Sequence, residues 1–453
     1  MRDLASRLRS IVQQEASRAP VSERPLVREL SYVAEGEEGG DIARAADGLG
    51  GLVHTTDRGA CVVVDRLWPA EAWYGCHQVG ECAMDRDAPI ALFDRRLEAH
   101  ATWAEHVVFL DIETTGLSGG AGTLAFLVGV AWFEDGAFRV RQFFLNGPAG
   151  ERAMLDALAE LFGRTSLLVT FNGRAFDVPV MDMRWAFHRL PTPTEALPHF
   201  DMLPPARRLW GEPGQRAGQQ QALGESQCDC SLTALERSLL GLHRYRDVAG
   251  FEIPTRYFQY LRTGDVRVVE GVLDHNRHDL VSLAAITSRA LALARVGPAA
   301  CQTPSELLGL GRLYERMGNT THAARAFELA ADAGHRAIRR QALAGLAILR
   351  RREGRFDDAA AAWQHVLTLT AEDEATPLGR RAAEALAIHH EHRARDLETA
   401  RRYAEVLSLG ASGQLRAEAR HRLDRLDRKL SNRRKRDEDL RRLTGASDET
   451  PST

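Results

Sequence analysis

An alternation of apolar, β-rich runs and helical patterns between residues 103 and 296 constrains the fold of this chain most strongly. Residues 107–110 form a continuous apolar run, which is typical of a strand buried on both faces of a sheet. Two further β-rich runs cover residues 123–134 and 137–145, and Asp135-Gly136 between them predicts a hairpin. We also expect helices over 151–162, 176–190, 232–240 and 268–294, and strands over 167–171 and 198–202. This order predicts an α/β fold with a mixed central sheet and flanking helices.

The length of 453 residues allows about three domains at roughly 150 residues each. Residues 1–102 are mixed and rich in glycine turns, so we expect a partly β lead-in whose function is unknown. The α/β domain is expected over residues 103–296. After it come a repetitive helical region at 303–411, a basic charged helix at 412–443 and a disordered tail at 444–453.

The region 303–411 shows a repeat of two helices. Its turn glycines Gly318 and Gly354 are 36 residues apart, and small residues followed by an aromatic come after each turn. A third, degenerate copy has Arg395 at the turn in place of glycine. Small residues let two antiparallel helices pack closely, and this period resembles tetratricopeptide repeats, which often bind a protein partner. A plain helical bundle is the alternative.

Charge excludes one class of protein and leaves another open. The chain has 59 Lys+Arg and 62 Asp+Glu residues, a net charge of −3, so it is not a uniformly basic nucleic-acid binder. Residues 416–442 nevertheless hold 12 basic and 6 acidic residues, a local charge of +6. This helix either caps the helical region or contacts a phosphate backbone, in which case binding weakens steeply with salt.

The cysteines and the apolar runs bear on the expected compartment. Six cysteines in a chain of this length do not make a disulfide framework, and none of their spacings matches a zinc knuckle. No run of 18 apolar residues is present, so we expect neither export nor membrane insertion and predict a cytoplasmic protein.

Acidic residues stand out at three places along the predicted strands and helices. Asp111 and Glu113 come after the first apolar run and alternate, so they share one face of the strand. Asp177 stands at the start of a helix, and His275 and Asp279 share one face of a later helix. Two like charges on one strand face are costly without a cation, which favours a divalent metal with oxygen ligands. Taken singly, the alternatives are a solvated strand end, a helix cap and surface residues.

Three motifs occur in a fixed order: DIETTGL, FNGRAFDVP and HNRHD. In this combination they resemble the DEDD exonucleases of the ribonuclease H-like superfamily. The segments GLSGGAGTLAFLVG, HFDML, CSLTALER and EIPTRYFQYLRTGD look most like the bacterial YprB-type ribonuclease H-like domain. The resemblance covers residues 107–290, and such domains often precede tetratricopeptide repeats.

The resemblance implies a ribonuclease H-like fold and a 3′→5′ exonuclease that acts on DNA or RNA. It makes Asp111, Glu113, Asp177 and Asp279 the ligands of two Mg²⁺ or Mn²⁺ ions. Two such ions about 4 Å apart activate a water and stabilise the leaving oxygen. A structure-selective endonuclease of the same fold is the first alternative, and a catalytically idle scaffold that acts through its repeats is the second.

The resemblance also makes His275 the general base, which takes the proton of the attacking water. The superfamily has a Tyr four residues before the last Asp or a His five before it, whereas this chain has His275 at four and Asp274 at five. This departure leaves the identity of the base open.

Polar residues beside the carboxylates are expected to touch the terminal nucleotide, with loop capping as the alternative: Thr114, Thr115, Gly116 and Asn172. Asp201 is expected to support the site from behind, and His199, Cys228 and Cys230 to serve structure. Residues 116–122 lack the Gly-Lys-Ser/Thr ending of a P-loop, which disfavours an NTPase.

Overall fold

The computed structural model describes residues 41–84, 87–98, 106–116, 122–211, 230–370, 376–409 and 413–444. The start of the expected lead-in, Cys228 and the expected tail from residue 445 lie outside the described residues.

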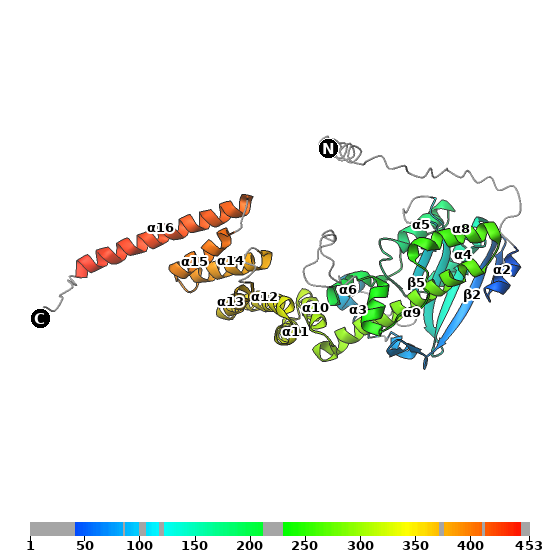
Figure 1. Cartoon of the computed structure of the whole chain (residues 1–453), viewed down its shortest axis with the longest axis horizontal. Helices are drawn as coiled ribbons and strands as arrows, with labels where there is room; N and C mark the ends of the chain where they lie inside the picture. Colours follow the sequence, from blue (N-terminus) through cyan, green and yellow to red (C-terminus); the bar gives the residue numbers. More distant parts are fainter. Residues whose placement is uncertain are drawn as a thin grey trace, which may run out of the picture. The chain divides into compact units, whose positions relative to one another are not determined.

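A seven-stranded mixed sheet organises the α/β part of the chain (Figure 1). Its strands, in spatial order, are β1 (Leu52–Thr56), β2 (Gly59–Pro69), β7 (Ala137–Phe144), β6 (Ala125–Glu134), β5 (Val107–Thr114), β8 (Leu167–Thr170) and β9 (His199–Asp201). Neighbours from β1 to β5 are antiparallel, and β5, β8 and β9 are parallel. The predicted hairpin joins β6 to β7, and Asp135 and Gly136 both adopt positive φ there.

The expected lead-in differs from the structure, because β1 and β2 are the outer strands of this same sheet. β2 pairs with β7 from Val62 opposite Phe144 to Pro69 opposite Ala137. Cys61, Val62 and Val64 are buried by this pairing. Residue 103 therefore does not mark the start of a separate sheet. The strand that pairs with β2 is β7, about 75 residues further along the chain. A second, two-stranded sheet consists of β3 (Trp73–Tyr74) and β4 (His77–Gln78).

Helices cover both faces of the large sheet. One buried cluster joins Leu110 and Leu155 to Trp185 and Tyr257, and the other joins Phe109 to Ile286. The helices of the α/β part are α2 (Ile42–Gly48), α3 (Ile90–Phe93), α4 (Glu151–Phe162), α5 (Asp177–Phe187), α6 (Leu203–Leu209), α7 (Leu232–Leu235), α8 (Ile253–Thr263) and α9 (Arg267–Val296). The predicted helix over 232–240 is α7 followed by one π-helical turn, and α6 and α8 were not expected.

Helix α9 runs for 30 residues and is apolar over most of its length. Among the described residues it is the helix that is long and apolar enough to cross a membrane. Its most apolar window is 72% buried inside the protein, as in the core helix of a folded domain.

Packed helices follow in an all-helical region: α10 (Pro304–Arg316), α11 (Thr320–Ala333), α12 (Arg336–Arg352), α13 (Phe356–Thr370), α14 (Pro377–His392), α15 (Leu397–Ser408) and α16 (Gly413–Thr444). The three predicted turns have matching backbones, since Gly318, Gly354 and Arg395 all adopt left-handed φ angles. Gly345 faces Phe327, and a Cβ there would lie 2.7 Å from the ring. The helical hairpins are therefore present, while their identity as tetratricopeptide repeats stays a prediction.

Part of the charge on α16 is used to pack this helix. Arg425 Nη2 and Lys429 Nζ each lie 2.7 Å from the carboxylate of Glu391 on α14, and Arg422 donates to Glu384. These contacts support the capping alternative for this side of α16.

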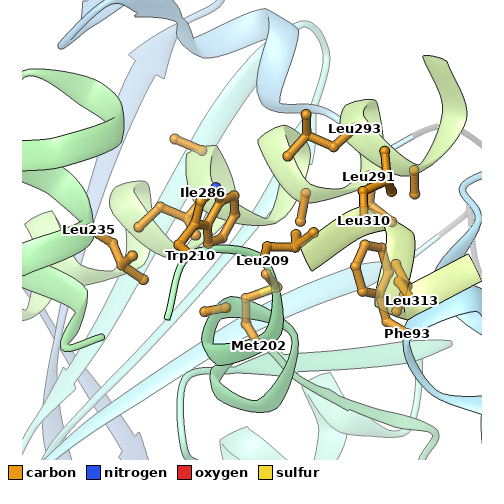
Figure 2. Packing of buried hydrophobic residues seen from close by; sticks show 14 of the residues in the cluster. Phe93, Met202, Leu209, Trp210, Leu235, Ile286, Leu291, Leu293, Leu310 and Leu313 are labelled. Carbon is orange, nitrogen blue, oxygen red and sulfur yellow. The ribbon is translucent and has the colours of Figure 1, made fainter. Parts of the chain in front are cut away.

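One buried hydrophobic cluster contains residues of both the α/β part and the first helices of the all-helical region. Figure 2 shows Trp210 beside Ile286, and Leu310 and Leu313 of α10 beside Leu291 and Phe93, in one buried cluster. Beside them, Trp210 Nε1 donates to the buried carboxylate of Glu306 at 3.0 Å. We call this contact of α6, α9 and α10 the junction.

Candidate active site

Three elements bring the four predicted carboxylates together. Asp111 and Glu113 lie on β5, Asp177 is the first residue of α5, and Asp279 lies on α9. Asp177 Oδ1 accepts a hydrogen bond from the backbone N–H of Ile112 at 3.2 Å, which fixes the start of α5 against β5. The four groups lie near one another, and their role as metal ligands stays a prediction.

Burial and mutual repulsion dominate the electrostatics of this cluster. Burial, followed by the charges of Asp279, Glu113 and Asp177, raises the pKa of Asp111 well above its ordinary value. The pKa of Glu113 is raised well above its ordinary value by burial and then by Asp279 and Asp177. Burial also raises the pKa of Asp177, against the backbone hydrogen bonds that lower it. Positive charge placed beside these groups favours their ionised forms.

Asn276 holds Asp111 in place. Its Nδ2 donates to the Asp111 carbonyl at 3.0 Å and to Asp111 Oδ2 at 2.8 Å. Its Oδ1 accepts from Gln142 Nε2 at 2.8 Å, and both amides are buried. A Cβ at Gly129 would lie 2.1 Å from Asn276 Oδ1, so the glycine is needed for this close approach. Sequence reasoning missed Asn276 and Gln142, although Asn276 stands inside the third motif.

His275 lies between two carboxylates. Its Nδ1 is 2.7 Å from Asp247 Oδ1, and its Nε2 is 3.6 Å from Asp279 Oδ2. In the neutral tautomer that donates from Nδ1 to Asp247, the acceptor nitrogen is Nε2, on the side of Asp279. Asp247 has no motif around it in the sequence and was not expected here.

Arg244 supplies a positive charge at one side of the cluster. Its guanidinium contacts Asp279 and Glu236, and its Nη1 lies 3.3 Å from Asp247 Oδ2. Glu236 in turn accepts from Ser282, whose hydroxyl lies 2.8 Å from the Tyr74 hydroxyl. Arg244 also lay outside the sequence motifs.

The four residues expected at the terminal nucleotide make hydrogen bonds within the loops. Thr114 Oγ1 donates to the Gly116 carbonyl at 2.9 Å, and Thr115 Oγ1 accepts from the Leu124 N–H at 3.0 Å. Asn172 adopts a φ of +66° and its N–H donates to Asp201 at 2.8 Å. These bonds support loop capping, and contact with a nucleotide stays a prediction.

Asp201 shapes the loop of the second motif. Its buried carboxylate accepts from the N–H groups of Asn172, Arg174 and Leu203 at 2.8–3.2 Å. His199, on the same strand, lies 2.8 Å from the Thr170 hydroxyl. Asp201 therefore holds the backbone that leads to Asp177, while His199 contacts the Thr170 side chain at the end of β8.

The donor set fits Mg²⁺ or Mn²⁺ by its chemistry, since hard divalent cations prefer carboxylate oxygens. In the described part of the chain, no three His, Cys, Asp or Glu side chains are arranged around a common point as metal ligands. Asp279 is instead bound to Arg244, and Asp111 to Asn276. A cation would add the charge that the cluster lacks and would compete with Arg244 for Asp279.

Comparison with known proteins addresses the α/β part. Residues 108–291, about two fifths of the chain, match the family model described as the RNase_H superfamily. The α/β part has a ribonuclease H-like fold. The chain is also 32% identical over 230 residues to "Uncharacterized protein YprB" of Bacillus subtilis (strain 168). This match covers 49% of the chain and 51% of the relative, so the chain spans about half the length of the curated protein that it matches.

Proposed function

We propose that this protein is a metal-dependent nuclease that hydrolyses phosphodiester bonds of DNA or RNA, acting as a 3′→5′ exonuclease. One observation carries the proposal: Asp111 and Glu113 from β5 and Asp177 from α5 lie close enough to Asp279 of α9 for its charge, added to their burial, to raise the pKa of all three. The cluster lies within the residues that match the RNase_H superfamily model. A nuclease fold implies a nucleic-acid substrate.

In this proposal Asp111, Glu113, Asp177 and Asp279 hold Mg²⁺ or Mn²⁺. The bound ions supply charge stabilisation for the attacking and leaving oxygens of an in-line displacement. The chain's own contribution is to aim the ligands. Asn276 fixes the orientation of Asp111, and the N–H of Ile112 fixes that of Asp177.

His275 serves as the general base in this proposal. Asp247 holds its Nδ1, and the Nε2 faces Asp279, where it accepts the proton of the attacking water. Asp247 is then a positioning residue, because it acts through the imidazole.

Further parts of the chain are given roles by the same proposal. Thr114, Thr115, Gly116 and Asn172 border the terminal nucleotide, and the helical region recruits a protein partner. The positive charge of α16 that is not used in packing contacts backbone phosphates. The cytoplasm is the proposed compartment, on the cysteine usage described above.

The test is hydrolysis of 3′- and 5′-labelled single- and double-stranded DNA and RNA by the purified protein with Mn²⁺. We expect release of mononucleotides from 3′ ends, and loss of this activity in Asp111→Ala and after chelation of the metal. Asp274→Ala is the matched control, because Asp274 lies on the exposed side of α9. Equal hydrolysis by wild type and Asp111→Ala would show that the activity comes from a contaminant.

The same assay separates the alternatives. Internal fragments in place of mononucleotides would identify an endonuclease. Inactivity of the wild type on every substrate would favour the idle scaffold, and the contact of Arg244 with Asp279 is the observation that favours it. If the protein is such a scaffold, Arg244→Gln weakens this contact but does not restore activity.

The assignment of His275 has its own test. Replacing it by Ala removes the proton acceptor, and we expect kcat to fall by roughly 10²-fold or more. Asp247→Asn keeps the imidazole but changes its partner, so we expect a smaller fall in kcat at unchanged KM. A normal kcat in His275→Ala would remove the residue from this role.

A further inference from the structure

Arginine side chains from four elements gather at the rim of the junction. The elements are the 3₁₀ turn Arg95–Leu97, the loop between β8 and α5, helix α6 and the end of helix α10. We call this set the arginine surface, and its members are Arg95, Arg96, Arg174, Arg208 and Arg316. Three of these residues are exposed, and Arg174 and Arg208 are half-buried.

Asp94 holds two of these arginines together. Arg96 binds it through Nε to Oδ1 at 3.0 Å and through Nη2 to Oδ2 at 2.9 Å. Arg174 Nη2 lies 2.8 Å from the same Oδ2. Asp94 brings one negative charge to two guanidinium groups, so the three side chains together keep a net positive charge. Arg174 precedes Asp177 by three residues, so their Cα atoms are at most about 11 Å apart.

Main-chain groups hold two further members of the arginine surface. Arg95 Nη2 donates to the Arg316 carbonyl at 2.7 Å, and Arg208 Nη1 donates to the Phe93 carbonyl at 3.2 Å. A carbonyl accepts a hydrogen bond but does not cancel the charge of a guanidinium group. Burial, followed by the charge of Arg316, lowers the pKa of Arg208, whereas Asp94 raises it. Arg208 and Arg316 are therefore close enough to repel each other.

The buried cluster at the junction fixes the backbone under these charges. Figure 2 shows Phe93 beside Leu313 of α10, and Leu209 of α6 belongs to the same cluster. Phe93 directly precedes Asp94, and Leu209 directly follows Arg208. Because a buried neighbour anchors each of these elements, the arginines are preorganised for a ligand.

The chemistry of the arginine surface favours a polyanion with several phosphates. The planar guanidinium fork of arginine matches the geometry of a phosphate group. A nucleic-acid strand carries one phosphate per nucleotide, so it offers several phosphates in a row. The arginine surface begins at the loop that leads to Asp177 and reaches the end of α10, which suits a strand that extends away from the carboxylates. An acidic protein segment is the alternative.

We propose that the arginine surface binds the phosphate backbone of the nucleic acid whose end lies at the carboxylates. Helix α10 of the all-helical region then forms part of the substrate-binding surface. This proposal rests on the proposed nuclease function for the identity of its ligand, and it adds the residues that bind the backbone beyond the carboxylates.

The salt dependence of binding, measured in EDTA so that hydrolysis does not interfere, tests this proposal. The full-length protein is titrated from about 50 to about 200 mM salt against a fluorescent strand of about 20 nucleotides and against its duplex. We expect Arg96→Gln and Arg316→Gln each to reduce the slope of log Kd against log salt by about one, and the double variant by about two. A loss on either probe supports the proposal and identifies that probe as the form bound.

Two further variants control for effects other than phosphate binding. Arg316→Lys keeps the charge, so it should keep the salt slope of wild type. Arg164→Gln removes a side chain that is 74% exposed, against 72% for Arg96, and should also leave the slope unchanged. Arg164 follows α4, whose buried residues belong to the other hydrophobic cluster. Thermal unfolding of each variant verifies that it is folded.

Three outcomes decide between the possibilities. Salt slopes of Arg96→Gln and Arg316→Gln equal to that of wild type would overturn the proposal. Tighter binding to polyglutamate than to either nucleic acid, weakened by the same substitutions, would identify an acidic protein segment as the ligand and would also overturn it. The expected slopes in a wild type that hydrolyses neither probe once Mn²⁺ is added would reject the nuclease function and leave the phosphate-binding surface in place.

Discussion

A buried carboxylate at the junction and a half-buried one on the inner strand β5 are treated in opposite ways by this fold. Glu306 at the junction accepts from Arg289 at 3.1 and 3.2 Å, from Trp210 at 3.0 Å and from the Gln302 N–H at 2.6 Å. Asp111 on β5 receives one side-chain amide, from Asn276, and faces three other carboxylates.

The difference separates a carboxylate whose charge is compensated inside the fold from one whose charge is not. A buried charge is tolerated when charged and hydrogen-bonding partners surround it, as at Glu306. A cluster of buried acids without that compensation is destabilised by its own charge, and the natural remedy is a cation from solution. The following predictions test this comparison.

The largest effect is expected at the junction. Glu306→Ala leaves Arg289 buried without its carboxylate and removes the partner of Trp210, so we expect a loss of about 3–5 kcal/mol in the free energy of unfolding. Urea unfolding followed by circular dichroism measures it. Glu306→Gln keeps the shape and part of the hydrogen bonding, and should lose less. A loss in Glu306→Ala no greater than for an exposed residue would break the comparison.

A change of stability with the opposite sign is expected at Asp111 on the inner strand β5. Because the pKa of Asp111 is raised in the folded state, folding disfavours its ionised form, and this cost grows as pH rises above its ordinary value of about 3.9. Asp111→Asn removes one like charge, so at neutral pH its metal-free Tm should exceed that of wild type.

Metal addition should reverse this order. At a Mn²⁺ concentration of about 100 Kd, wild type should gain about 2.7 kcal/mol, whereas Asp111→Asn should gain much less. Thermal unfolding with and without Mn²⁺ measures both effects. A wild type that is insensitive to Mn²⁺, together with a destabilised Asp111→Asn, would mean that the cluster is structural.

A further effect is expected at the half-buried His199. Burial, its largest cause, lowers the pKa of His199 to about 4. The folded protein therefore prefers the neutral ring, and stability is lost as pH falls from about 6.5 toward 4, by up to about 1.4 kcal/mol per pH unit. Urea unfolding at several pH values measures the slope, and His199→Gln should flatten it. Equal slopes in both proteins would contradict the assignment.

The elements that were predictable carry their signal locally. The helix at α4 and the β6–β7 hairpin follow from side-chain periodicity and from one turn dipeptide, and both were confirmed. The place of β2 in the sheet was not predictable, because its partner β7 lies far along the chain. No local pattern in residues 59–69 encodes that partner.

The candidate site divides in the same way. Asp111, Glu113, Asp177 and Asp279 stood in recognisable motifs, and the fold brings them into one cluster beside the inner strand β5. The groups that orient them, such as Gln142, Arg244 and Asp247, come from other elements and have no motif. Their role depends on the approach of α9 to β5 and β7, which only the assembled fold defines.

Helix α9 links the two regions compared above. It carries His275 and Asp279 in its first half and Leu291 and Leu293 at the junction, and 30 residues make it about 45 Å long. An unbroken helix is a stiff rod, so its two ends do not move independently. A partner that binds α10 would therefore also restrain the C-terminal end of α9, the helix that positions His275.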